Sequence, residues 1–164
     1  MRTLKISLFI LIGLSLWWSR VEGPLRDPEE ALKDFYETQY RAESQLQDPL
    51  ILNGSNVLPL VLRDLPDKNM PRRRYAIGYI GNGRYEEAIP ALKKILHDNS
   101  ELNYFRADAL EAIYQIDMSL SRNLAANFTN EPELLGRVAK KIVSGESPIY
   151  SERTFWDAFM GIHH

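Results

Sequence analysis

The segment Val57–Asp64, which reads VLPLVLRD, returns along the chain as Ala88–Asp98, AIPALKKILHD. A second segment, Arg73–Ile80 or RRYAIGYI, returns as Arg106–Ile113, RADALEAI. The prolines of the two copies lie 31 residues apart and the first arginines 33. A period in the low thirties with two helical segments per period is typical of α-solenoids, in which each helical hairpin packs on its neighbours. The sequence therefore predicts an all-α fold, a short α-solenoid of helical hairpins with about eight helices.

Each copy of the repeat places a proline, Pro59 or Pro90, where a helix is expected to begin. Proline is tolerated in the first helical turn, because the N–H group that it lacks would have no partner there. Apolar residues around Pro90 then recur with helical spacing, as a stripe on one side of the helix. No segment has the alternating pattern of a strand. The stripe consists of Ala88, Ile89, Leu92, Ile95 and Leu96.

Three further parts flank the repeats, which occupy residues 48–145. Residues 24–47 are predicted to form an N-terminal capping helix that starts at Asp27-Pro28, an N-cap aspartate followed by a proline. This helix is expected to run to Gln47 and to be ended by Asp48-Pro49. Residues 146–164 are predicted to form an aromatic C-terminal tail, and residues 1–23 precede the domain.

Residues 1–23 have the composition of an export signal, with Arg2 and Lys5 ahead of an apolar run over residues 6–18. As a helix that run would span roughly 20 Å, whereas a bilayer core is about 30 Å thick, so its length favours a signal peptide. Trp17-Trp18 followed by Arg20 suits an interfacial anchor instead. A cleaved signal and a retained membrane anchor both remain open. Either one predicts an extracytoplasmic protein, with membrane contact through residues 6–18 if the segment is kept.

Charge and cysteine content exclude several classes of function. The formal net charge is -2, and without residues 1–23 it becomes -4, from 17 bases and 21 acids. A nucleic-acid binder would carry a basic excess, so nucleic acid is not expected as a partner. The chain has no cysteine, which excludes disulfides, thiolate metal sites and a cysteine nucleophile.

Residues 55–117 resemble HEAT-like helical repeats of the PBS-lyase type, and the strings AIPAL and RADAL are the most specific part. In that family an aspartate that ends one repeat commonly contacts the arginine that opens the next helix. The resemblance therefore implies a structural ladder in which Asp64 pairs with Arg73 and Asp98 pairs with Arg106. The chain departs from the family in its loops, since eight residues separate the first pair and seven the second.

A tetratricopeptide-like repeat is the rival interpretation. It requires Pro90 to lie well inside a helix, and it puts Ser100 where such repeats usually have proline. Both families are stacks of helical hairpins, so the choice between them changes the expected function little. The residues with tetratricopeptide-like spacing are Ala76, Tyr79, Gly83, Tyr85, Ala88 and Leu92.

The sequence contains no recognisable catalytic group, so we expect no catalytic residue, metal or cofactor. His97 is predicted at a helix end, where a cation interacts favourably with the helix dipole, and His163-His164 belong to the terminal tail. Gly81-Asn82-Gly83 is a turn without the downstream lysine of a phosphate loop. Glu86-Glu87 are adjacent on a helix and point about 100° apart, which does not suit a carboxylate pair.

Two groups of residues are candidates for binding a partner. Arg72-Arg73-Arg74 stand at a helix start, which is the unfavourable end for cations; Arg73 is expected in the ladder, leaving Arg72 and Arg74 for an acidic partner or lipid head groups. Arg63, Ala91, Lys93 and Lys94 are expected to line the concave face of the solenoid. Phe155, Trp156 and Phe159 either cover the last repeat or form a docking surface.

Together these features predict a non-enzymatic scaffold or assembly module of the cell envelope or exported space. It would recognise a protein partner, itself membrane-associated or exported, through the solenoid surface. The alternative is an enzyme or enzyme subunit on a helical-repeat scaffold, which would need a metal or cofactor.

Overall fold

The computed structural model describes residues 26–39, 42–149 and 153–162. All regular structure in these ranges is helical, so the predicted all-α class is confirmed. Short 3-10 helices cover Glu43–Gln45, Gly54–Val57 and Glu86–Ala88. The α-helices are α2 (Pro28–Glu37), α3 (Asp48–Asn53), α4 (Leu58–Asp64), α5 (Arg73–Asn82), α6 (Ile89–His97), α7 (Asn103–Ile116), α8 (Met118–Ala125), α9 (Glu133–Ser144) and α10 (Phe155–Met160).

The predicted signal peptide or anchor, residues 1–23, lies outside the described residues. Within the described ranges, no helix has the length and apolar character needed to cross a membrane.

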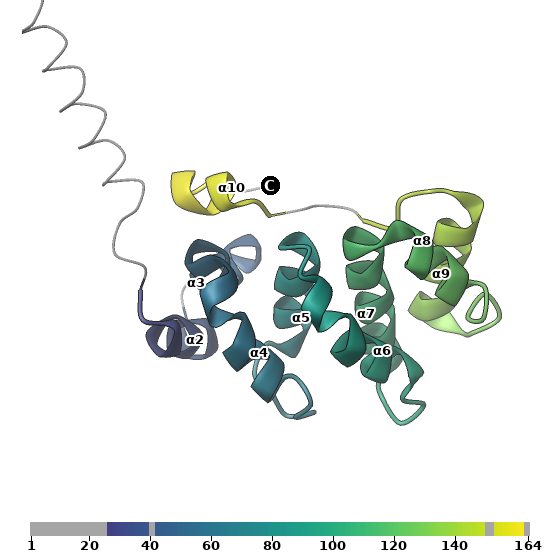
Figure 1. Ribbon diagram of the computed structural model, residues 1–164, viewed down its shortest axis with the longest axis horizontal. Coiled ribbons are helices and arrows are strands. Elements are labelled where there is room, and N and C mark those ends of the chain that lie inside the picture. The colour runs from purple at the N-terminus through teal and green to yellow at the C-terminus, as the bar shows by residue number, and fades with distance from the viewer. Residues whose placement is uncertain (1–25, 40–41, 150–152, 163–164) are drawn as a thin grey trace, which may run out of the picture.

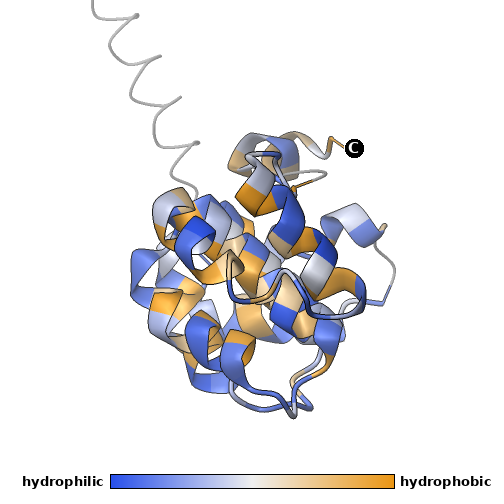
Figure 2. Ribbon diagram, turned by 90° about the vertical axis from the view of Figure 1, so that its right-hand side faces the viewer, coloured by the Kyte–Doolittle hydropathy of each residue, from blue (hydrophilic) through white to orange (hydrophobic). Residues whose placement is uncertain are grey.

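Helix α7 is at the centre of the packing, in contact with α5, α6, α8 and α9. The helices follow one another along the long axis of the molecule from α2 to α9, with α5 and α7 side by side (Figure 1). Pro59 and Pro90 lie in the first turns of α4 and α6, as predicted. Apolar side chains from successive helices, such as Ile80, Leu92 and Leu110, are fully buried in one core. The apolar residues gather toward the interior between the helices (Figure 2).

The predicted N-terminal capping helix is shorter than expected. Asp27 caps α2 as predicted, but the helix ends at Glu37 rather than at Gln47. Asp48-Pro49 begins α3 instead of ending a helix, because an aspartate and a proline are as favourable in a first turn here as they are at Asp27-Pro28. The end of α2 is held by Arg72, whose guanidinium donates to the carbonyl groups of Phe35 and Thr38.

The C-terminal tail does not cover the last repeat. Instead α10 packs against α3, at the opposite end of the molecule from α9 (Figure 1). A buried ion pair between Arg153 and Asp48 holds it there. The C-terminal tail thus packs on the N-terminal helix α3 rather than on α9.

Candidate partner-binding groove

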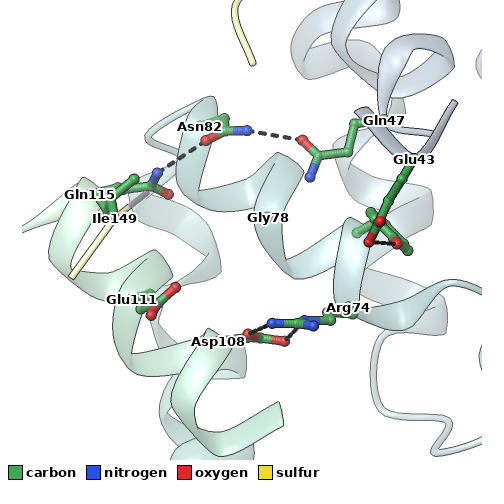
Figure 3. A pocket seen from close by; sticks show the side chains of 10 residues that line it. Glu43, Gln47, Arg74, Gly78, Asn82, Asp108, Glu111, Gln115 and Ile149 are labelled. Atoms are coloured by element: carbon green, nitrogen blue, oxygen red, sulfur yellow. Dashed lines mark hydrogen bonds and ion pairs between the residues drawn. The ribbon is translucent and has the colours of Figure 1, made fainter. Parts of the chain in front are cut away.

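A polar groove of about 280 Å³ crosses the surface of α5 and α7 (Figure 3). Its floor comes from these two helices, and its edges come from the 3-10 helix at Glu43 and from Ile149 in the tail. The groove combines three sets of paired side chains with one partly buried acid. Its lining residues are Glu43, Gln47, Arg74, Tyr75, Gly78, Asn82, Asp108, Glu111, Gln115 and Ile149.

A ladder of side-chain amides runs along one side of the groove. The Asn82 Nδ2 atom donates to Gln47 Oε1 at 2.9 Å, and Gln115 Nε2 donates to Asn82 Oδ1 at 3.0 Å (Figure 3). The three residues are 35 and 33 positions apart, which matches the period of the sequence repeat. Each amide of the ladder therefore orients the next.

An ion pair with the same spacing forms the opposite side of the groove. The Arg74 guanidinium donates to both carboxylate oxygens of Asp108, at 2.8 and 3.2 Å, across 34 residues of sequence. The Asp108 side chain is 10% exposed and that of Arg74 is 56% exposed. Burial raises the pKa of Asp108, and the arginine opposes that shift. The guanidinium is fixed by the carboxylate while much of its surface remains in contact with solvent.

Glu111 is a carboxyl group of the groove whose pKa is raised toward neutrality. It lies near Asp108 on α7 (Figure 3), and burial, followed by repulsion from Asp108, raises its pKa to about 7. Arg74 and Lys141 act in the opposite direction. Near neutral pH the Glu111 carboxyl therefore exchanges between charged and neutral forms, and a cation bound beside it would favour the charged form.

Tyr75 closes the third side. Its hydroxyl donates to Glu43 Oε1 at 2.7 Å, and burial, together with that hydrogen bond, raises the pKa of Tyr75 to about 12. The phenol thus stays protonated and joins α5 to the 3-10 helix of Glu43–Gln45.

The groove depends on close approach between α5 and α7. A Cβ atom added to Gly81 would lie 2.9 Å from the Ala112 Cα atom and 2.0 Å from Gln115 Oε1. Only a glycine leaves room there for both the neighbouring backbone and the amide ladder.

The predicted ladder of Asp64 with Arg73 is not formed. Arg73 donates to the Leu65 carbonyl at 2.8 Å and pairs with Glu101 at 2.6 Å, while Asp64 accepts from Arg63 and Tyr36. Arg73 thus reaches the backbone beside Asp64, but its acidic partner is Glu101, because the Asp64 carboxylate is engaged by Arg63 and Tyr36.

The second predicted rung, Asp98 with Arg106, is replaced in the same way. Arg106 donates to the Leu96 carbonyl at 2.9 Å and to Glu131 at 3.3 Å. Asp98 pairs with Lys68 at 2.8 Å and accepts from Ser100. Arg73 and Arg106 thus make the same kind of contacts, each with a backbone carbonyl at the end of the preceding helix and with a glutamate from a later loop.

The basic residues predicted to bind a partner do not form one patch. Arg74 lines the groove, whereas Arg72 is bound to the end of α2. Arg63, on α4, pairs with Asp64 and with Glu29 of α2, and Lys93 and Lys94 are exposed on α6. The groove lies on α5 and α7, so it does not include Arg63, Lys93 or Lys94, whose role in partner binding stays a prediction.

Ala91 and Lys94 line a different pocket. It lies between α4 and α6, and its other members include Leu62, Pro90 and the buried pair of Arg73 with Glu101. This pocket has a mainly apolar lining, in contrast to the polar groove.

The predicted aromatic residues of the tail form an exposed cluster on α10. Phe155, Trp156 and Phe159 are 39%, 55% and 53% exposed. Each ring contacts the other two, with centroid distances between 5.5 and 5.9 Å.

Most groove residues were not anticipated from the sequence, although a signal was present. Asn82 and Gln115 repeat with the same offset of 33 residues as Arg73 and Arg106. Within the described residues, no group of three or more histidine or acidic side chains is placed to hold a metal ion. His163 and His164 lie outside those residues.

Comparison with protein-family models, with curated proteins and with solved structures found no match for this chain.

Proposed function

We propose that the protein is a non-enzymatic binding scaffold of the HEAT-like solenoid type, exported or anchored in the membrane, that recognises a protein partner through the groove on α5 and α7. The observation that carries the proposal is the set of cross-repeat pairs that line this groove. Arg74 is the residue of the predicted partner-binding set that takes part.

The pairs support recognition because they hold polar groups in place before a partner arrives. The amides of Asn82 and Gln115 are already oriented by hydrogen bonds, and the Arg74 guanidinium is fixed by Asp108. A preorganised surface loses less side-chain entropy on binding, so more of the interaction energy appears as affinity.

The charges of the groove favour a partner segment that carries a cation. Glu43, Asp108 and Glu111 supply three carboxyl groups, against the single guanidinium of Arg74 among the lining residues. A lysine or arginine of the partner would stabilise the ionised form of Glu111. Electrostatic complementarity of this kind sets specificity and association rate more than affinity.

A photo-cross-linking experiment on the full chain tests the groove. A photoreactive phenylalanine derivative replaces Tyr75 in one variant and Lys93, exposed on α6, in the control. We expect a discrete protein adduct from Tyr75 that disappears when Glu111→Lys is added. We expect no adduct of that mass from Lys93.

An adduct from Lys93 and none from Tyr75 would place the binding surface on α4 and α6 instead. Adducts from Lys93 alone, or Tyr75 adducts that persist with Glu111→Lys, contradict a role for the groove. Circular dichroism of each variant establishes that the fold is retained.

A further inference from the structure

The exposed side of α10 is an apolar surface that no other element covers among the described residues. Ala158 is the buried residue of α10 at 8% exposed, Phe155 lines a pocket beside Ile51 of α3, and Trp156, Phe159 and Met160 are 55%, 53% and 64% exposed. Ile162 extends this surface beyond the helix at 44% exposed. The exposed apolar residues are Phe155, Trp156, Phe159, Met160 and Ile162.

The only acid within α10 is turned away from this surface by a capping box. The Asp157 carboxylate accepts from the backbone N–H of Thr154 at 2.9 Å and from its hydroxyl at 2.6 Å. Arg153, just ahead of the helix, is buried and paired with Asp48. Among the described residues, the exposed side of α10 is therefore apolar and aromatic, and the two charged groups nearest to it, Asp157 and Arg153, are held by these contacts.

The position of α10 relates this surface to the apolar run of residues 6–18. The Asn53 side chain, at the end of α3, donates to the Arg26 carbonyl at 2.8 Å, and α10 packs on the same α3. The seven residues between Trp18 and Arg26 can span at most about 25 Å. The apolar run thus joins the described domain at the end that carries α10, the end formed by α2 and α3 in Figure 1.

We propose that the exposed face of α10 rests in the interfacial layer of the lipid bilayer that residues 6–18 enter. Tryptophan and phenylalanine favour this layer, and a short amphipathic helix binds it weakly unless a second membrane signal is present. The apolar run supplies that second signal, and the pair of Arg153 with Asp48 sets the orientation of the domain against the membrane. The inference rests on the membrane-anchored form of the proposed scaffold.

Fluorescence of a single tryptophan tests this contact in the full chain. The protein contains three tryptophans, so Trp17→Phe and Trp18→Phe leave Trp156 alone. The probe is a phosphatidylcholine vesicle, with or without brominated acyl chains that quench tryptophan at short range. We expect a blue shift of Trp156 emission and quenching by the brominated lipid. Because the described residues of this surface are uncharged, high salt should leave both unchanged.

The matched control moves the fluorophore to another exposed aromatic position. Tyr104, 40% exposed at the start of α7, becomes tryptophan in a chain that also carries Trp156→Phe. We expect no quenching there. Phe159→Asp in the Trp156 chain should abolish quenching, because a carboxylate in the patch opposes burial in lipid.

Each other outcome overturns the inference, and the outcomes are distinguishable. A protein that floats with the vesicles but gives equal signals at Trp156 and the Tyr104 position is anchored without this contact. A protein that fails to float lacks the anchor as well. A protein cross-link at Trp156, without lipid quenching, assigns α10 to a protein partner. None of these results affects the groove, which the Tyr75 cross-link tests separately.

Discussion

Arg153 forms a bidentate ion pair with Asp48, a residue 105 positions earlier, with N–O distances of 3.0 and 3.2 Å. The two side chains are 7% and 5% exposed. The pair ties the C-terminal tail to the first turn of α3. It is therefore the contact that decides where the aromatic helix α10 lies.

Loss of one member of this pair should destabilise the domain. Asp48→Ala leaves the Arg153 guanidinium buried without its counter-charge, and we expect the free energy of unfolding to fall by about 3 kcal/mol. Urea denaturation measures the change. Asp34→Ala, which removes an exposed pair with Arg26, should cost less than about 1 kcal/mol. Equal effects of the two substitutions would contradict a structural role for the buried pair, and Asp48→Leu with Arg153→Met should recover most of the loss.

The buried ion pair of Arg73 with Glu101 yields a second prediction. Because Arg73 pairs with Glu101 in the interior, Glu101→Ala should lower the free energy of unfolding by about 3 kcal/mol. Asp64→Ala removes an acid whose partners are Arg63 and Tyr36, and should cost about 1 kcal/mol. If denaturation instead gave Asp64→Ala the larger effect, the family-like pairing of Asp64 with Arg73 would be the correct one.

Two glycines of α5 should respond differently to the same substitution. A Cβ at Gly81 meets the Ala112 backbone, so Gly81→Ala should cost about 1–3 kcal/mol by overpacking. A Cβ at Gly78 meets only the end of the Gln47 side chain, which can move at the cost of its hydrogen bond with Asn82, and alanine has the higher helix propensity, so Gly78→Ala should cost less than Gly81→Ala. Thermal melts of the two variants report the difference. A larger loss of stability for Gly78→Ala would contradict the close contact between α5 and α7 at Gly81.

Glu111 should make stability depend on pH. Its pKa is raised from 4.5 to about 7, so between these values the folded chain holds a proton that the unfolded chain has lost. The free energy of unfolding therefore falls as pH rises through this window. Glu111→Gln removes the effect, and its advantage over the natural chain should grow from near zero below pH 4 to on the order of 1 kcal/mol at pH 8, since partial exposure screens the charge.

Urea denaturation at pH 4, 6 and 8 measures this difference. Glu37→Gln, at the exposed end of α2, has the same change in net charge and serves as the control. An advantage of Glu111→Gln that is constant with pH would show that the carboxyl is not the cause.

Several elements of the fold could be predicted because they depend on local chemistry. Pro59 and Pro90 mark helix starts through a missing N–H group, and the stripe around Leu92 follows from helical periodicity. Asp48-Pro49 was misassigned for a related reason, since the same dipeptide can follow one helix or begin the next. Arg72, far along the chain, donates to the end of α2 at Phe35 and Thr38, and no local pattern contains such a contact.

The groove could be predicted only in part. Asn82 and Gln115 are hydrogen-bonded and lie 33 residues apart, the offset of the sequence repeat, so this spacing is the sequence signal for the amide ladder. The raised pKa of Glu111 could not be predicted, because it depends on burial beside Asp108. The acidic partners of Arg73 and Arg106 could not be predicted either, because Glu101 and Glu131 lie 28 and 25 residues further along the chain.

By itself the sequence determined the helical class and the apolar stripe of a helix such as α6, since these follow from spacing along one helix. Tertiary structure alone decided the partners of the charged side chains and the place of α10. Arg153 meets Asp48 across 105 residues, and each arginine of the repeat reaches a glutamate of the next loop. Buried ion pairs are set by distances in space and by desolvation, neither of which is encoded in any short stretch of chain.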